Sequence, residues 1–519
     1  MDQTAGETTP RTPAYAWYVL AILFVVYILN FIDRQIISIL GEDIKRDLNL
    51  RDEDLGFLYG TAFGVFYALF GIPLGRLADT WHRVRLLAAG LALWSAMTMV
   101  SGLSRGGGML AGARIGVGVG EASAAPAAYS LISDWFPKRL RATALAIYSA
   151  GLYVGGGLSL FIGGLIVNRW NAAYPGGGPL GLHGWQAAFM IVGAPGLLLA
   201  LIVLTLREPR RGAAEGLPTP PPHPAPFRAF AAELVTIVPP FTLIGAARGG
   251  MRALVVNITA LALVAGGVFA LVRLGEPPAQ WIAWGLGVYA VFSWASALRR
   301  RDPPTFRLIA ANPAFLCVVV AYGLNAFIAY SISLFAAPYA VRTFAVPLTQ
   351  AGGLIGGIGA ASGFIGVTLG GAIADRLRQR HPAGRVMMII FGAVAPVPAI
   401  VTAFTTTSPA LFYAMLAPAQ ILASCALGAA AATTQDLVLP RMRGTATATF
   451  LIGTTLLGIA LGPYLAGRIS TLSGSLSIGV LSLLATVPIT LAAAIAAFRL
   501  VPQAEQQREA WARKAGEPA

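Results

Sequence analysis

Four charged residues lie inside long apolar stretches of the sequence. Asp33 and Arg34 are adjacent in the first stretch, and Arg114 and Glu121 lie in the fourth. A charge at the centre of a bilayer is costly, so it normally faces a bundle interior or a water-filled path. Arg114 and Glu121 are seven residues apart, nearly two helical turns, and share one helix face about 10 Å apart along the axis. The sequence therefore predicts a polar centre inside a helical bundle.

This charged group predicts anion binding coupled to proton movement. Arginine stays protonated and offers a planar fork of donors to phosphate or carboxylate, so Arg34 and Arg114 are the candidate headgroup ligands. Asp33 and Glu121 are the candidate proton-coupling residues. Counted from the helix ends expected near Leu40 and Gly107, Asp33, Arg34 and Arg114 lie at one depth and Glu121 lies deeper and more isolated. An anionic headgroup would then compete with Asp33 for the two arginines and free Asp33 for a proton.

The alternative is a static ion-pair network that only holds helices together. Buried pairs are poor stabilisers compared with apolar packing, which favours the functional interpretation.

The composition indicates that membrane-spanning helices position these four charged residues. The chain has 519 residues, 56% hydrophobic and 11% charged, whereas soluble domains average about 25% charged residues. Apolar runs of membrane-spanning length predict fourteen spans, arranged as six, two and six. They lie near 17–40, 54–78, 85–103, 108–135, 142–167, 185–206, 251–273, 279–298, 313–341, 349–374, 386–406, 409–436, 444–467 and 476–499. The expected fold is an all-α polytopic membrane protein with a six-helix bundle in 1–211, a linker with two extra spans in 212–310, and a second six-helix bundle with a tail in 311–519.

The basic residues predict the orientation. The net charge of +15 comes mostly from short loops between the spans, as the positive-inside rule expects, and not from a nucleic-acid surface. The loops that start near Arg76 and Arg376 fall on one side, and the acid-rich loop 42–54 falls on the other. Both termini are therefore expected in the cytoplasm, and in a bacterium the protein would lie in the inner membrane.

An internal repeat supports two related six-helix halves. Residues 75–79 (Gly-Arg-Leu-Ala-Asp) and 371–375 (Gly-Ala-Ile-Ala-Asp) close the second span of each half. A second pair of signatures has the same seven-residue spacing in both halves: Asp134 with Arg141, and Asp436 with Arg443. Parallel repeats of this kind build transporters whose substrate sits between the halves.

Residues 75–83, Gly-Arg-Leu-Ala-Asp-Thr-Trp-His-Arg, resemble the cytoplasmic signature of the major facilitator superfamily. The resemblance implies a latch that holds the cytoplasmic side closed. Thr80 replaces the usual base and His82 the usual glycine, so the latch is expected to be weaker. The alternative is that these charged loops only fix topology. The candidate gate residues are Gly75, Asp79, Arg83, Asp134, Arg141, Asp375, Asp436 and Arg443.

Three segments resemble spinster-like transporters of that superfamily: residues 30–35 (Asn-Phe-Ile-Asp-Arg-Gln), 114–122 and 133–139. The resemblance covers about 17–211 and 310–500 but not 227–300. Related anion:cation symporters share the Asp-Arg pair. The resemblance implies proton-coupled alternating access and an anionic lipid substrate, of the lysophospholipid or phosphorylated sphingoid type. The expected partners are this substrate, protons and membrane lipids, and the expected state is a monomer.

The remaining candidates are uncharged residues that would line a cavity by hydrogen bonding. They are Asn30, Tyr322, Asn325, Ser333 and Gln420. With so few hydrogen-bonding groups, a proton-coupled symporter of a water-soluble organic anion is the second interpretation.

An enzyme is a remote alternative. The sequence has no GxSxG, HExxH or GxxxxGK[ST] motif, its four histidines do not cluster, and its two cysteines stand alone. We therefore expect no cofactor and no metal.

The two extra spans, within 251–298, are expected to be peripheral. They interrupt the repeat, carry no buried carboxyl, and contain Trp281, Trp284 and Trp294, which suit the membrane interface.

Overall fold

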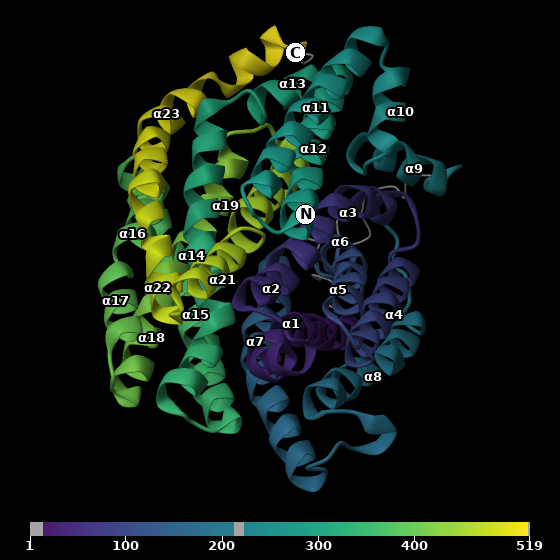
Figure 1. The fold of residues 1–519 in the computed structure, drawn as a ribbon. Helices are drawn as coiled ribbons and strands as arrows, with labels where there is room; N and C mark the ends of the chain where they lie inside the picture. Colours follow the sequence, from purple (N-terminus) through teal and green to yellow (C-terminus); the bar gives the residue numbers. More distant parts are fainter. Residues whose placement is uncertain (1–13, 212–222, 517–519) are drawn as a thin grey trace, which may run out of the picture.

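A computed structural model describes residues 14–211 and 223–516, and it is helical throughout. Two groups of helices lie side by side, one from each end of the chain, with α11 and α12 between them (Figure 1). The first half contains α1 (Ala14–Leu48), α2 (Asp52–Gly56), the π-helix η1 (Phe57–Thr61), α3 (Ala62–Thr80), α4 (Arg83–Gly102), α5 (Gly107–Glu121), α6 (Ala124–Trp135), α7 (Lys138–Ala173), the 3₁₀ turn η2 (Pro179–Gly181) and α8 (Gly184–Leu204).

The rest of the chain forms an insert and a second half. The insert contains α9 (Pro226–Ile237), α10 (Phe241–Arg248), α11 (Met251–Arg273), α12 (Pro278–Arg301) and α13 (Pro303–Leu308). The second half contains α14 (Pro313–Phe344), α15 (Leu348–Arg380), α16 (Gly384–Val394), α17 (Val397–Thr405), α18 (Pro409–Ser424), α19 (Ala426–Asp436), η4 (Pro440–Met442), α20 (Arg443–Gly453), the π-helix η5 (Thr454–Ile459), α21 (Gly462–Ser473), α22 (Leu476–Ser482), η6 (Leu483–Thr486) and α23 (Val487–Lys514).

Helix lengths confirm a polytopic membrane protein. Within residues 14–211 and 223–516, thirteen helices are long and apolar enough to cross a membrane. The expected fourth span is α5 followed by α6, which is not among the thirteen because it is short, glycine-rich and broken after Glu121. The sequence did not predict α9 and α10, which are bent by 97° against each other. The proline tract that precedes α9 lies partly outside the described residues.

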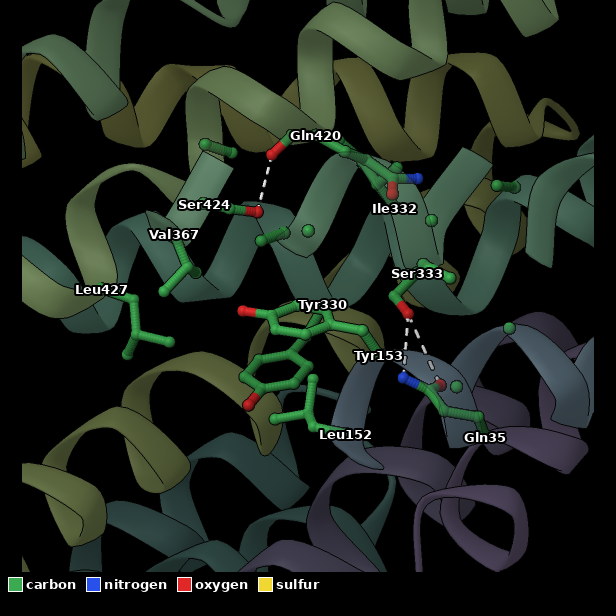
Figure 2. Close-up of a pocket in the computed structure, with 18 of the residues that line it drawn as sticks. Gln35, Leu152, Tyr153, Tyr330, Ile332, Ser333, Val367, Gln420, Ser424 and Leu427 are labelled. Carbon is green, nitrogen blue, oxygen red and sulfur yellow. Dashed lines mark hydrogen bonds between the residues drawn. The ribbon is translucent and has the colours of Figure 1, made fainter. Parts of the chain in front are cut away.

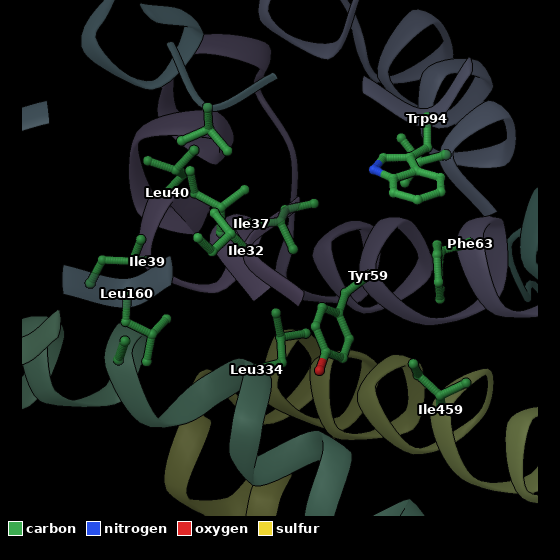
Figure 3. Close-up of a cluster of buried hydrophobic side chains, with 14 of the residues drawn as sticks. Ile32, Ile37, Ile39, Leu40, Tyr59, Phe63, Trp94, Leu160, Leu334 and Ile459 are labelled. Carbon is green, nitrogen blue, oxygen red and sulfur yellow. The ribbon is translucent and has the colours of Figure 1, made fainter. Parts of the chain in front are cut away.

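A hydrophobic core joins the two halves. It combines Ile37 and Leu40 of α1 and Tyr59 of η1 with Leu334 of α14 and Ile459 of η5 (Figure 3). These residues lie toward the membrane face that the positive-inside rule predicts to be external, which we call the outer side. A second core, built around α14, α19 and α23 of the second half, also takes in Leu308 of α13. The halves are therefore sealed together at the outer side by dry packing.

Gly60 lies where the backbones of the two halves approach each other closely. A Cβ atom there would lie 2.1 Å from the backbone oxygen of Ile459, whereas one at Gly71, further along the same helix, would meet nothing within 4 Å. Gly60→Ala is therefore expected to push the outer side open, and Gly71→Ala to leave it closed. The measurement is labelling of a Ser38→Cys reporter, buried at this seam, by an impermeant maleimide from the outer side. Equal labelling of the two variants would contradict this prediction.

The prediction that the insert is peripheral is wrong for one of its two spans. Only 6% of the apolar window of α11 is buried, but 44% of that of α12 is. Ala290 and Trp294 of α12 form a core with Val65 of α3 and Leu456 of η5. Trp294 is thus a buried packing residue and not an interfacial anchor, because α12 lies in the groove where the two halves meet.

Candidate functional site

A cavity of about 240 Å³ lies between the halves. Four of the five predicted cavity residues line it: Tyr322, Asn325, Ser333 and Gln420. Further polar residues that were not predicted from the sequence also line the cavity, among them Gln35, Tyr153, Tyr330 and Ser424 (Figure 2). None of these side chains is charged, so the cavity wall itself offers hydrogen bonds and aromatic surface.

Gln35 closes the outer end of this cavity. Its Nε2 donates to Oγ of Ser333 across the halves at 3.1 Å, and its Oε1 accepts from the Tyr59 hydroxyl at 2.9 Å. Next to it, the Ser38 hydroxyl donates to the Leu334 carbonyl at 2.6 Å. In the described parts of the chain, the hydrogen bonds between the halves lie at this level or further outward. The cavity is therefore sealed from the outer side.

The charged residues pair differently from the sequence-based prediction. Nη2 and Nε of Arg34 donate to Oε2 of Glu121 at 2.7 and 3.2 Å. Glu121 is therefore the paired carboxylate and not the isolated one. The reason is the length of α1, which continues to Leu48 rather than ending at Leu40. Arg34 and Glu121 are then equally far from the outer ends of α1 and α5 and lie at one depth.

Asp33 has no ion pair among the described residues. Nη1 of Arg114 donates to the backbone oxygen of Asp33 at 3.0 Å and not to its side chain. The polar side chains of Trp94 and Thr98 lie next to the Asp33 carboxyl group. Asp33 is only 1% exposed, so its carboxyl group sits in a polar pocket inside the first half, where a charge without an ionic partner is costly.

Three predicted ligands lie behind the cavity wall. Arg34, Arg114 and Asn30 are buried and do not line the cavity. Aromatic rings cover Arg34: its guanidinium carbon lies 4.7 Å from the ring centre of Phe31, which lines the cavity, and 4.5 Å from that of Phe63. Residues 31 and 35 face the cavity one helical turn apart, so Arg34 points into the first bundle. The expectation that Asn30 lines the cavity is wrong for the same reason.

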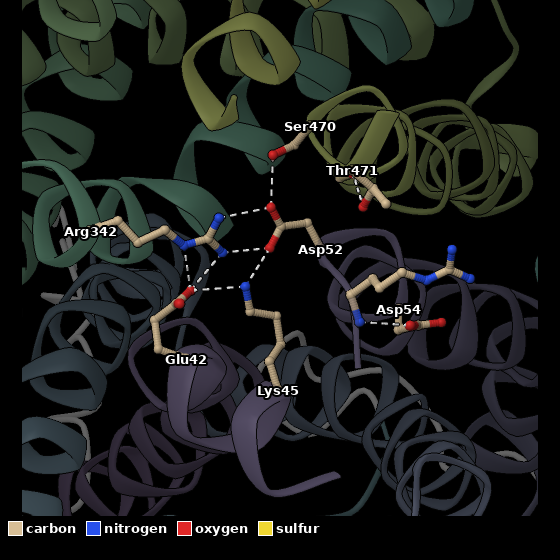
Figure 4. A network of polar contacts seen from close by, with 9 residues as sticks. Glu42, Lys45, Asp52, Asp54, Arg342, Ser470 and Thr471 are labelled. Atoms are coloured by element: carbon tan, nitrogen blue, oxygen red, sulfur yellow. Dashed lines mark hydrogen bonds and ion pairs between the residues drawn. The ribbon is translucent and has the colours of Figure 1, made fainter. Parts of the chain in front are cut away.

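A second charged group, not predicted from the sequence, joins the halves at the outer side (Figure 4). Asp52 of the first half accepts from Nη1 of Arg342 at 2.8 Å and from the Ser470 hydroxyl at 2.7 Å, both in the second half. Lys45 donates to Asp52 at 2.7 Å, and Nη2 of Arg342 donates to Glu42 at 2.6 Å. The acid-rich loop therefore meets an outer arginine of the other half and forms an outer gate: Glu42, Lys45, Asp52, Arg342 and Ser470.

Glu276, in the loop between α11 and α12, extends these contacts to the insert. It accepts from the Tyr464 hydroxyl at 2.7 Å and from Nε of Arg468 at 3.3 Å, and Arg468 also donates to Glu53 of the first half at 2.8 Å. Partial desolvation favours the neutral carboxyl, but bonds from Tyr464, Trp281 and Arg468 outweigh it and lower the pKa of Glu276.

This lowered pKa predicts a pH-dependent stability. A carboxylate whose pKa is lowered by folding stabilises the protein above its ordinary pKa, about 4.3, and loses this effect as the pH falls through the lowered value. The Tm advantage of the wild type over Glu276→Gln is expected to be full at pH 7 and to shrink below about pH 4.3. Thermal unfolding of both proteins across this range is the measurement. A constant difference would contradict the prediction.

The predicted cytoplasmic gate residues form one matching ion pair in each half. Arg83 pairs with Asp134, and Arg385 pairs with Asp436, both across 51 residues of sequence. Arg385 also binds Asp375 at 2.8 Å. The internal repeat therefore includes matching ion pairs in the structure. Arg385, which pairs with Asp436 and Asp375, was not among the predicted gate residues.

The other predicted gate residues lie near these ion pairs. Arg141 donates to the Ser133 carbonyl at 2.9 Å. Gly75, Asp79 and Arg443 lie near this side of the membrane, and Asp79 and Arg443 are exposed. The contacts described for the gate residues stay within one half. The latch therefore stays a prediction, because it needs the halves to meet on this side.

Comparisons with known proteins agree with this architecture. The profile of the Major Facilitator Superfamily matches residues 23–237 and 234–463. The chain is 28% identical over 458 residues to an MFS-type efflux pump of Mycolicibacterium smegmatis, covering 88% of this chain and 85% of that protein. It is 28% identical over 220 residues to a probable galactarate/D-glucarate transporter of Bacillus subtilis, covering 41% of this chain and 45% of that one.

The chain is also similar over nearly its whole length to a protein of known crystal structure. That protein is a bacterial homologue of the human lysosomal transporter spinster, in an inward-facing and unoccupied conformation. The identity is 26%, the alignment covers 98% of this chain and 99% of that one, and the TM-score is 0.66.

Proposed function

The chain belongs to the Major Facilitator Superfamily, as a spinster-like transporter and not an enzyme, and we propose that it carries an anionic amphiphilic lipid by proton-coupled alternating access. The observation that carries this proposal is the Arg34–Glu121 pair, buried directly behind a cavity between two halves that are sealed at the outer side. A secondary transporter must alternate which side of such a cavity is open.

The pairing suggests how an anion and a proton are coupled. Oε2 of Glu121 takes both bonds from Arg34, and Asn30 is a further hydrogen-bond partner of its carboxyl group. A phosphate or carboxylate that reached Arg34 past Phe31 would compete with Glu121 for the guanidinium fork. Glu121, released in a buried site, would then be neutralised by a proton. The anion therefore displaces Glu121 from Arg34 first, which makes Glu121 the first proton site and Asp33 the second.

The lipid part of the proposal rests on the spinster-like resemblance and on the cavity wall. Aromatic and small residues such as Phe31, Tyr153 and Gly156 line the space, and such a wall tolerates an acyl chain. The cavity of about 240 Å³ is smaller than typical ligand pockets of about 300–1,000 Å³. A single-chain lipid would therefore extend beyond it, with its headgroup toward Gln35.

An organic-anion symporter is the second candidate, favoured by one observation. The cavity carries more hydrogen-bonding side chains than the sequence indicated, including Gln35 and Tyr330 in addition to the four expected. A sugar acid needs many such groups.

Proteoliposome uptake separates the two candidates. The liposomes receive a lysophospholipid or D-glucarate, each with and without an inward proton gradient. Proton-stimulated uptake of the lysophospholipid is expected. Uptake of D-glucarate that excess lysophospholipid does not reduce would replace the lipid proposal with the organic-anion one.

A further inference from the structure

The inserted helix α12 touches both halves at the place where they must separate. We propose that α12 is a third component of the outer gate: it clamps η1 to η5 while the outer side is closed. This inference rests on the alternating access proposed above.

The backbone of η5 takes one hydrogen bond from α12. A π-turn shifts helical hydrogen bonds by one residue, and here the N–H of Ala460 bonds the Thr455 carbonyl at 2.9 Å. That N–H is then not available to the Leu456 carbonyl, which instead accepts from Nε1 of Trp284 at 3.1 Å. A buried carbonyl needs such a partner. Helix α12 therefore completes the hydrogen bonding of a gate helix.

A three-way contact lies at Gln280. The Thr61 hydroxyl, at the end of η1, lies 2.7 Å from Oε1 of Gln280 and 2.6 Å from the Ala460 carbonyl oxygen, and its one proton can be donated to either. Nε2 of Gln280 lies 3.4 Å from that same carbonyl. Gln280 is only 1% exposed and Thr61 is fully buried. One residue from each half and one from the insert thus meet inside the seam.

Packing also joins α12 to both halves. Ala290 and Trp294 lie in one buried cluster with Val65 of α3 and Leu456 of η5, and Glu276 adds side-chain bonds to Tyr464 and Arg468 of the second half. Separation of the halves therefore requires α12 to leave one of them.

Two indole substitutions test the clamp. In a variant without native cysteines, carrying the Ser38→Cys reporter, Trp284→Phe removes the bond to Leu456. It is expected to raise labelling from the outer side about two- to tenfold, the range for one lost hydrogen bond. Trp281→Phe is the matched control, because Trp281 donates within the insert, to Glu276. Equal rates in the two variants would overturn the clamp.

A reporter that is never labelled from the outer side in protein with Trp284 intact, with or without lysophospholipid, would instead refute alternating access itself.

Discussion

Replacing Arg34 with alanine is expected to abolish transport while leaving the protein folded. Removing one partner of a buried ion pair costs about 3–5 kcal/mol when the other charge remains. Glu121 escapes most of this cost by taking up a proton, so the fold survives. Without the guanidinium fork, however, an anion finds no donor in its place, and Glu121 stays protonated throughout the cycle. Initial uptake rates in proteoliposomes, together with Tm, measure the two effects separately.

Two further variants make this prediction specific. Arg46→Ala is the matched control: Arg46 is on the same helix, also pairs with a carboxylate, and is 71% exposed, so transport should persist. Arg34→Leu/Glu121→Leu removes both charges. If the pair only held helices together, this double variant would transport normally. Normal uptake in that protein would contradict a functional role of the Arg34–Glu121 pair.

The burial of the four charged residues could be predicted from the sequence, but their pairing could not. Asp33, Arg34, Arg114 and Glu121 stand in apolar stretches, and a charge in such a stretch is driven into the bundle interior. The pairing depends on where each helix ends and how it is rotated. An apolar run does not mark the end of α1, because the helix continues past the membrane core to Leu48.

The outer gate could not be predicted from the sequence for another reason. The acid-rich loop containing Asp52 was apparent, but Arg342 lies 290 residues later. Their contact exists only when the halves meet on this side, so it depends on the conformational state as well as on the fold. The apolar composition of α12 likewise gave no sign that Gln280 lies in the seam, since a single buried amide resembles any interhelical hydrogen bond.

Replacing Asp52 with alanine is expected to open the outer side. Its carboxylate accepts from Lys45 of the first half and from Arg342 and Ser470 of the second. Without it, Arg342 keeps its bonds to Glu42 but loses those to α2, and Lys45 and Arg342 are left with one carboxylate between them. A shift of about 3–5 kcal/mol, as for a broken buried pair, moves a two-state equilibrium by about two to four orders of magnitude. Outer labelling of the Ser38→Cys reporter should approach completion, and transport should fall because the outer side no longer closes.

Asp54→Ala is the matched control for this prediction. Asp54 lies two residues further along α2 and accepts a bond from the backbone N–H of Arg51 in its own half, so its loss should leave the outer side closed. If Asp52→Ala and Asp54→Ala label equally slowly, apolar packing alone holds the outer side closed and the charged group does not act as a gate.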